Sequence, residues 1–322
     1  MAEKNSNAIS ERTGWKTACS GFAGSISAFI FHPLENLKLR LQANDGMSNN
    51  HLPHYRGLVN TAKIMYQTEG MVSFFRGVFV NFLGNSSANF IFFYMYAVEK
   101  RRWNYDRETS PSWVPAIISL ESGVVACLIT NPIWTVKTRL GLHLNTQGKA
   151  LSGFGLTRKI VTDMWSKEGP TSFYRGFPAA CLLSIYGVIQ MTCYENLNKL
   201  FGYKESEKSY KKISPFFIGG ISKCLASTLL HPLTLVKTRQ QKQRFSTKEA
   251  QRIIDKNLSE EVTKAAKNAD VYYVTIHDSA KSIFRNEGMR GFYKGLSPNL
   301  IRIFPSSGVF FMIYEAMLKF LE

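Results

Sequence analysis

One nine-residue pattern occurs three times in this chain of 322 residues. It reads His-Pro-Leu-Glu-Asn-Leu-Lys-Leu-Arg from His32, Asn-Pro-Ile-Trp-Thr-Val-Lys-Thr-Arg from Asn131 and His-Pro-Leu-Thr-Leu-Val-Lys-Thr-Arg from His231. The prolines of the three copies lie 99 and 100 residues apart. A period this long indicates one fold built from three copies of the same unit.

Each copy continues with an acid-Gly pair and closes with an aromatic-base-Gly triplet. The pairs are Glu69-Gly70, Glu168-Gly169 and Glu287-Gly288, and the triplets are Phe75-Arg76-Gly77, Tyr174-Arg175-Gly176 and Tyr293-Lys294-Gly295. These motifs resemble the signature of the mitochondrial carrier family over nearly the whole chain. The resemblance implies an all-α membrane protein of three tandem repeats, each with two transmembrane helices and an amphipathic helix on the matrix side. The six spans would form a barrel-like bundle with pseudo-threefold symmetry.

We divide the chain into an N-terminal tail (1–12) and repeats 13–104, 105–204 and 205–322, the last with an insertion near 244–270. Six segments are nearly free of charged residues. Three of them contain none: 17–34, 77–98 and 176–194. The other three contain one each, which is Glu121 in 113–136, Lys223 in 213–236 and Arg302 in 295–314. Each is close to the roughly 20 residues that cross a bilayer as a helix. Prolines 33, 132 and 232 should bend their helices. Amphipathic stretches occur at 55–66, 154–165 and 272–284.

The chain holds 40 Lys and Arg against 23 Asp and Glu. This excess is dispersed and accompanies no nucleic-acid-reading motif, so we expect no nucleic-acid partner. Much of it lies in the long loops, which the positive-inside tendency places in the matrix. Five cysteines fall in the predicted spans without metal-ligand spacing, and no catalytic constellation is present. We therefore predict no metal, no cofactor and no enzyme activity.

The resemblance implies a gate at the matrix end, in which the acid of one odd-numbered helix pairs with the lysine of the next. Carried over, Glu35 pairs with Lys137, but Trp134 and Thr234 occupy the other two acid positions. Gln42 matches a glutamine that braces a gate pair. The predicted matrix gate comprises Glu35, Lys38, Gln42, Lys137 and Lys237.

A second gate is implied at the cytosolic ends of the even-numbered helices. Its predicted residues are Tyr96, Lys100, Tyr194, Glu195, Tyr314 and Glu315. Cyclic pairing leaves only Glu315 with Lys100, so both gates are thin. Because a water-exposed pair contributes only about 0–1 kcal/mol, thin gates predict either a fast transporter or a former one.

Helix N-termini attract anions, and the aromatic-base-Gly triplets open the even-numbered helices. The resemblance implies that these places bind the headgroups of cardiolipin. The predicted lipid-binding residues are Arg76, Gly77, Arg175, Gly176, Lys294 and Gly295. The alternative is a helix start whose basic side chain reaches the membrane surface.

The family's substrate contacts map to the middle of the even-numbered helices. They fall on Gly84, Asn85, Leu183, Ser184, Gly187 and Arg302, with Lys223 as a further candidate. A guanidinium at the membrane midplane is costly unless it meets an anion, which makes Arg302 the foremost of them. Arg302 could instead pair with Glu121, and a Glu121–Lys223 ion pair is as consistent with the pattern as a ligand contact for Lys223.

Asn-Pro-Ile-Trp at Asn131 resembles the family branch that carries flavin, folate, nicotinamide and pyrimidine nucleotides. We predict transport of a bulky anionic metabolite, such as FAD, NAD, folate or a pyrimidine nucleotide, across the mitochondrial inner membrane by alternating access. The partners are then that anionic substrate, cardiolipin and other membrane lipids. Two alternatives stay open: a nucleotide carrier of the peroxisomal membrane, and a non-transporting subunit that serves as a scaffold in a larger inner-membrane complex.

Overall fold

The computed structural model describes residues 21–44, 55, 57–105, 111, 113–143, 153–200, 214–242 and 275–321. Every regular element in these ranges is a helix. The N-terminal tail and the insertion predicted near 244–270 lie outside the described residues. In the part of the chain that the structure describes, the protein is therefore all-α with a threefold repeated helical unit, as the sequence predicted.

The described elements follow the same order in each repeat. The first repeat contains a helical segment Gly21–Ile30, α2 (His32–Ala43), α3 (Gly57–Glu69), the 3₁₀ turn η1 (Met71–Phe75) and α4 (Val78–Arg102). The second contains α5 (Val114–Leu142), α6 (Phe154–Asp163), the π-helical turn η2 (Met164–Glu168), the 3₁₀ turns η3 (Pro170–Tyr174) and η4 (Leu183–Ile185), α7 (Phe177–Leu182) and α8 (Tyr186–Leu200). The third contains α9 (Ser214–Leu229), α10 (His231–Lys242), α13 (Ile276–Gly291) and α14 (Leu296–Leu321).

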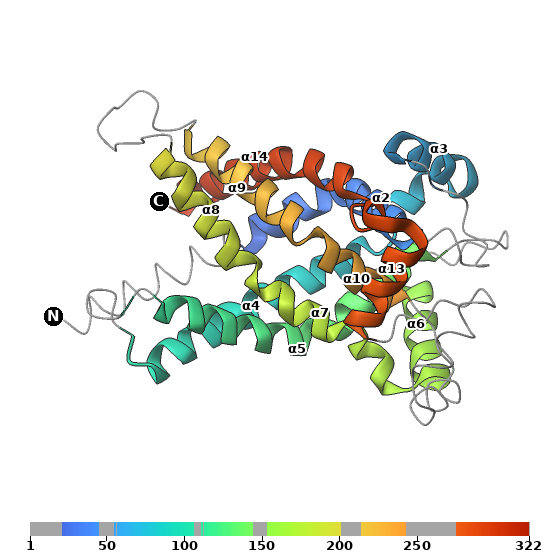
Figure 1. Ribbon diagram of the computed structural model, residues 1–322, viewed down its shortest axis with the longest axis horizontal. Helices are drawn as coiled ribbons and strands as arrows, with labels where there is room; N and C mark the ends of the chain where they lie inside the picture. The colour runs from blue at the N-terminus through green and yellow to red at the C-terminus, as the bar shows by residue number, and fades with distance from the viewer. Residues whose placement is uncertain are drawn as a thin grey trace.

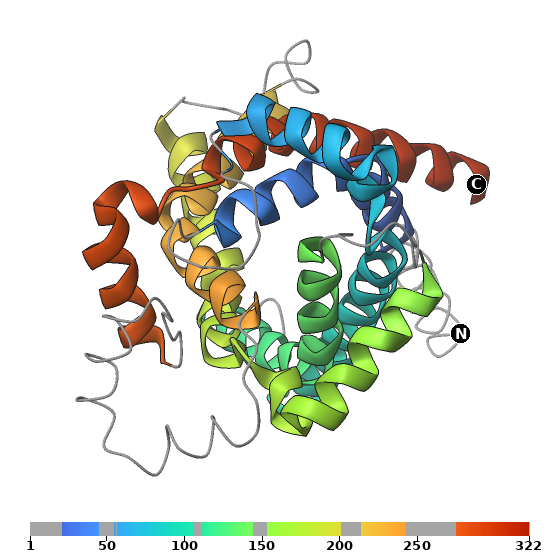
Figure 2. The ribbon, with the colours of Figure 1, turned by 90° about the vertical axis from the view of Figure 1, so that its right-hand side faces the viewer.

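Seen end-on, the long helices form a closed ring (Figure 2). Neighbours in the chain are neighbours in the ring: α4 packs on α5, α8 on α9, and α14 returns to α2. The three short helices α3, α6 and α13 lie together at one end of the bundle (Figure 1). They coincide with the predicted amphipathic stretches. We call this end, which also carries the three repeated motifs, the signature end.

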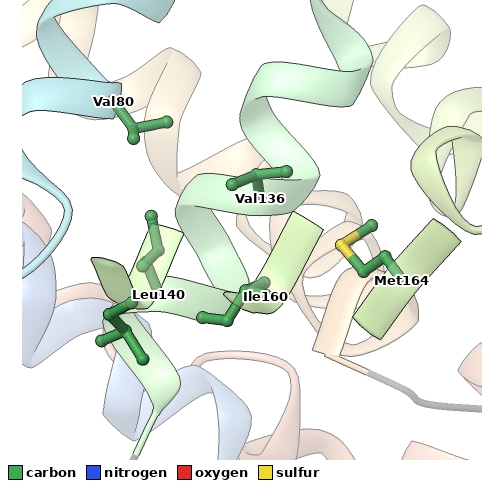
Figure 3. Close-up of a cluster of buried hydrophobic side chains, with 6 residues drawn as sticks. Val80, Val136, Leu140, Ile160 and Met164 are labelled. Carbon is green, nitrogen blue, oxygen red and sulfur yellow. The ribbon is translucent and has the colours of Figure 1, made fainter. Parts of the chain in front are cut away.

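Small apolar clusters fasten the short helices to the ring. Where the first repeat meets the second, Val80 of α4, Val136 and Leu140 of α5, Ile160 of α6 and Met164 pack together with Leu156 (Figure 3). Equivalent clusters join α13 to α10 and α3 to α2. Each cluster buries one face of a short helix, and this burial holds the signature end together.

Among the described helices, α5 and the segment Pro170–Leu200 are long and apolar enough to cross a membrane. Gly21–Ile30 and Phe217–Leu229 are apolar but shorter. The helices α4 and α14 have 25 and 26 residues, which is long enough to span, but small polar residues such as Asn85 and Ser86 lower the hydropathy of α4. Such residues suit helices whose inner faces meet polar groups.

The prolines act differently in the three repeats. The helix is interrupted at Phe31 before Pro33 and at Leu230 before Pro232, as expected for a residue that removes a backbone hydrogen bond. In contrast, α5 continues through Pro132 without interruption. A further break was not predicted: the turn η4 separates α7 from α8, whereas α4 and α14 are continuous. A 3₁₀ turn inside a helix often marks a functional position.

Glycine is required at the start of the second long helix of a repeat. These helices are α4, α7 with α8, and α14, and they are the even-numbered transmembrane helices of the sequence analysis. Gly77 and Gly176 have left-handed backbones, with φ of 82° and 75° and ψ of 7° in both. A Cβ at Gly176 would lie 3.1 Å from the carbonyl oxygen of Lys237, whereas a Cβ at Gly77 would meet Leu140 at an ordinary 3.4 Å. The two positions therefore share a backbone conformation but differ in space.

We expect Gly176→Ala to destabilise the protein more than Gly77→Ala. Both substitutions impose the left-handed penalty of about 1–2 kcal/mol. Only Gly176→Ala also forces a rigid backbone carbonyl to move. Thermal unfolding of the full-length protein in detergent measures the difference, and equal melting temperatures for the two variants would contradict it.

Candidate functional site

The last arginine of each repeated motif is buried and paired. The pairs are Arg40 with Glu69, Arg139 with Glu168 and Arg239 with Glu287. In each case the glutamate belongs to the acid-Gly motif of the same repeat. Arg139 and Glu168 form two parallel bonds of 2.6 and 2.9 Å, the bidentate geometry that suits a guanidinium and a carboxylate.

The same arginines join neighbouring repeats. Arg40 Nε donates to the carbonyl of Gly141 at 3.3 Å, Arg139 Nε to that of Gln241 at 3.2 Å and Arg239 Nε to that of Gln42 at 3.1 Å. Each bond therefore joins the first long helix of one repeat, called odd-numbered in the sequence analysis, to that of the next: α2 to α5, α5 to α10 and α10 to α2. Together the three bonds close a ring at the signature end.

The bases of the aromatic-base-Gly triplets turn toward the same glutamates. Arg76 lies 2.6 Å from Glu69, Arg175 lies 2.8 Å from Glu168, and Lys294 contacts Glu287. The glycines after them pack against the motif lysines: a Cβ at Gly295 would lie 3.0 Å from the carbonyl of Lys38. These bases and glycines thus have structural partners, and lipid binding there stays a prediction.

Next to this ring, farther from the signature end along the bundle, is a second layer formed by the motif lysines and a single described carboxylate. Lys137 Nζ contacts Glu35 Oε1, which is the pair predicted from the sequence. Arg302 Nη1 of α14 lies 3.6 Å from the other oxygen, Glu35 Oε2. Lys38 lies close enough to interact electrostatically with Glu35, and Lys237 lies close enough to interact with Lys38 and Lys137. One described carboxylate therefore lies in a layer with four basic side chains, three of which interact with it directly.

The two lysines without a predicted acid differ. Lys38 Nζ donates to Asn299 Oδ1 at 3.0 Å, and the amide of Asn299 in turn donates to Ser227. An amide thus takes the place of the missing acid, a role that the sequence did not reveal. Within the part of the chain that the structure describes, Lys237 makes no hydrogen bond or ion pair.

Neutral contacts reinforce the ring at two of its three junctions. Thr238 Oγ1 donates to Gln42 Oε1 at 3.0 Å, and Thr138 Oγ1 donates to Gln241 Oε1 at 2.8 Å. At the third junction the equivalent residues are Leu39 and Gly141, which touch each other closely. In this structure Gln42 therefore contacts a threonine and does not brace a lysine–acid pair.

The substrate positions taken from the family are not all open. Gly84 is buried, and a Cβ there would meet Ile133 and Trp134 at 3.3–3.4 Å. Asn85 donates to the carbonyl of Asn81 at 2.9 Å, and a Cβ at Gly123 would lie 3.4 Å from Ser184.

The remaining substrate positions lie on α8, α9, α14 and the turn η4. Leu183 and Ser184 form that turn with Ile185. A Cβ at Gly187 would meet no atom within 4 Å. Arg302 and Lys223 are both partly exposed.

The pairing alternatives for Glu121 are not found in this structure. Glu121 Oε2 accepts a hydrogen bond from Trp103 Nε1 at 3.2 Å, and its carboxylate forms no ion pair with a described residue. The carboxylate beside Arg302 is Glu35. The even-numbered helix of the second repeat, α7 with α8, stands between α5 and α9, which explains why Glu121 does not reach Lys223.

The predicted cytosolic gate has no described ion pair. Lys100 lies over the ring of Tyr105 at 5.0 Å, and Tyr96 stacks on Phe92. Glu195 forms no ion pair with a described residue. The side chains of Tyr314 and Glu315 lie outside the described residues. Of the two predicted gates, the one at the signature end contains a described ion pair, Glu35–Lys137.

Comparison with known proteins agrees with this geometry. The mitochondrial carrier protein family matches the chain three times, at residues 11–107, 108–205 and 208–322. The chain is 31% identical to "Folate transporter 1, chloroplastic" of Arabidopsis thaliana, with 96% of each chain covered. It is 28% identical to "Solute carrier family 25 member 36" of Gallus gallus, covering 94% of this chain and 96% of that one.

A yeast relative adds a third named solute. The chain is 26% identical to "Mitochondrial nicotinamide adenine dinucleotide transporter 1" of Saccharomyces cerevisiae, with 95% of this chain and 77% of that one covered. The threefold match spans nearly the whole sequence and coincides with three copies of one helical unit. The chain belongs to the mitochondrial carrier family of membrane transport proteins.

Proposed function

We propose that this carrier moves a bulky anionic metabolite, of nucleotide or folate type, across the mitochondrial inner membrane by alternating access. The observation that carries the proposal is the charge imbalance at the signature end. Glu35 interacts with Lys38, Lys137 and Arg302, and Lys237 lies beside Lys38 and Lys137 without an acid of its own among the described residues. Uncompensated positive charge inside a membrane bundle is costly, and a polyanionic substrate would offset it.

The relatives support the size and charge of this substrate. Their names refer to folate and to nicotinamide adenine dinucleotide, each of which combines planar rings with two anionic groups. A guanidinium and several ammonium groups suit such anions. One relative is named as chloroplastic, so membership of the family does not fix the organelle. The mitochondrial location is part of the proposal, and the peroxisomal membrane is its alternative.

In this mechanism the structure represents the state closed at the signature end, which would face the matrix. The arginine ring and the Glu35–Lys137 pair join the repeats there. Substrate enters from the opposite end, binds beside Arg302 and weakens the lysine layer by competing for its charges. The repeats then separate at the signature end and release the substrate.

A ligand screen tests the substrate class. We expect NAD, FAD, UTP or folate to raise the melting temperature of the detergent-purified carrier, because a ligand bound to the folded state stabilises it by mass action. Uridine and nicotinamide riboside, which lack phosphate, serve as matched controls. If the controls stabilise the protein as well as the anions do, charge does not determine recognition and the proposed class is wrong.

The thin gate yields a second test. Thr234→Asp restores the acid that the family pattern places opposite Lys38, which now bonds to Asn299. A new pair worth about 1 kcal/mol would favour the closed signature end roughly fivefold. We expect slower uptake by liposomes and a higher melting temperature, with Thr234→Asn as the uncharged control. Identical behaviour of the two variants would show that charge at residue 234 has no part in gating.

The missing acids also favour a second candidate, the scaffold subunit in an inner-membrane complex. Trp134 occupies the position where the family pattern has the gate acid of the second repeat, and it packs on Gly84. An apolar contact thus replaces one of the three gate pairs. A scaffold does not need to open and can tolerate this loss. It predicts a folded protein that carries no solute.

A further inference from the structure

The seam between α9 and α14 is held at two levels. At one level the Phe217 and Phe304 rings lie 6.4 Å apart, and Gly220 packs directly against Phe304. At the other, Asn299 donates to Ser227. Gly220 and Ser227 are seven residues apart on α9 and so lie on one helix face. The contacts that hold α9 against α14 therefore lie at two levels. Between these levels each helix has about one turn that takes no part in them.

Lys223 and Arg302 occupy this intermediate level. Lys223 lies between Gly220 and Ser227 on α9, and Arg302 lies between Asn299 and Phe304 on α14. The two side chains are close enough to interact electrostatically. The described residues offer the ammonium group of Lys223 no hydrogen bond and no ion pair, and among them the guanidinium of Arg302 has only the 3.6 Å contact with Glu35. Two like charges are thus held side by side by packing that does not involve them.

A third helix reaches the same level. Tyr186, the first residue of α8, donates its hydroxyl to the carbonyl of Lys223 at 3.3 Å. This bond anchors the backbone of Lys223 and leaves its ammonium group available. The turn η4 immediately precedes Tyr186, so the break in this even-numbered helix falls beside the two cations.

We propose that Lys223 and Arg302 form a clamp for two neighbouring anionic groups of the substrate, either a pyrophosphate or a pair of carboxylates. The clamp deepens the proposed function and rests on it. Two adjacent cations bind one extended dianion better than two separate monoanions, because the second contact costs little further translational freedom. The guanidinium supplies a planar fork and the ammonium a point charge.

The clamp also connects binding to the gate. Arg302 lies between Lys223 on one side and Glu35 on the other, and Glu35 holds Lys137. An anion bound by Arg302 competes with Glu35 for the guanidinium. Substrate binding is thereby coupled to Glu35–Lys137, the lysine–acid pair that joins two repeats among the described residues of this layer.

Thermal unfolding of the full-length carrier with simple probes tests the clamp. The probes are inorganic pyrophosphate, glutarate as the dicarboxylate, and orthophosphate at matched ionic strength. We expect one of the two probes with two anionic groups, pyrophosphate or glutarate, to stabilise the wild type far more than orthophosphate, which has one. Pyrophosphate stabilisation identifies a nucleotide-type group, whereas glutarate stabilisation identifies a folate-type tail. Equal effects of all three probes overturn the proposal.

Variants at residue 223 complete the test. In Lys223→Gln the half-saturating concentration of the effective probe should rise roughly tenfold to hundredfold, the range expected for one charge-assisted bond. Lys223→Arg should restore most of the affinity, and Lys159→Gln, an exposed residue of α6, should behave as the wild type. Wild-type affinity in Lys223→Gln overturns the clamp. Liposome uptake is measured in parallel: probe binding without any saturable uptake leaves the clamp in place and refutes transport.

Discussion

Glu168→Gln is expected to lower the free energy of unfolding by about 3–5 kcal/mol, the usual effect of removing one partner from a buried ion pair. Glu168 accepts bonds from both Arg139 and Arg175, and the side chain of Arg139 is only 2% exposed. Glutamine leaves Arg139 charged and buried with one oxygen acceptor in place of two. Since Arg139 also bonds to Gln241, the loss should spread to the junction between the second and third repeats.

Asp163→Asn provides the matched control. Asp163 and Lys167 form an ion pair in the same repeat, but their side chains are 41% and 72% exposed. Exposed pairs contribute about 0–1 kcal/mol, so this variant should melt close to the wild type. If Glu168→Gln were as mild as Asp163→Asn in thermal unfolding, the arginine ring would not be what closes the signature end.

Arg302→Ala is expected to reduce substrate uptake by roughly a hundredfold, because the substrate loses a charge-assisted bond at its main anchor. Folding should be preserved, since Glu35 keeps its contact with Lys137. Arg302→Lys should retain part of the activity as a point charge without the planar fork. Uptake by liposomes and thermal unfolding are measured together.

The control for Arg302 is Arg158→Ala, which removes an exposed guanidinium from α6. This variant should transport as the wild type does. Uptake by Arg302→Ala that equals uptake by Arg158→Ala would remove Arg302 from the substrate site. Because the two variants delete the same group, a general effect of net charge cannot account for a difference between them.

The repeated motifs predicted most of the architecture because each motif residue has a local structural role. His32 and His231 donate to the carbonyls of Arg76 and Lys294 and so fix the turns that start α4 and α14. The amphipathic period predicted the three short helices. The Glu35–Lys137 contact was implied by the resemblance to the carrier family, and the structure contains it.

Other features depend on partners distant in the chain and could not be predicted in this way. Asn299 replaces an acid for Lys38 across 261 residues. The continuation of α5 through Pro132 and the break at η4 depend on packing that no local motif encodes. A signal for the arginine ring was present, since an arginine seven residues after each proline recurs in all three copies.

Uptake of labelled anions by liposomes that contain only the purified wild-type protein tests the transport claim most directly. NAD, UTP and folate are offered outside, with and without an excess of the same unlabelled compound inside. The account predicts saturable uptake of at least one of them, and competition by the other members of its class. A protein that unfolds cooperatively yet gives no saturable uptake of any of these anions would contradict transport and favour the scaffold.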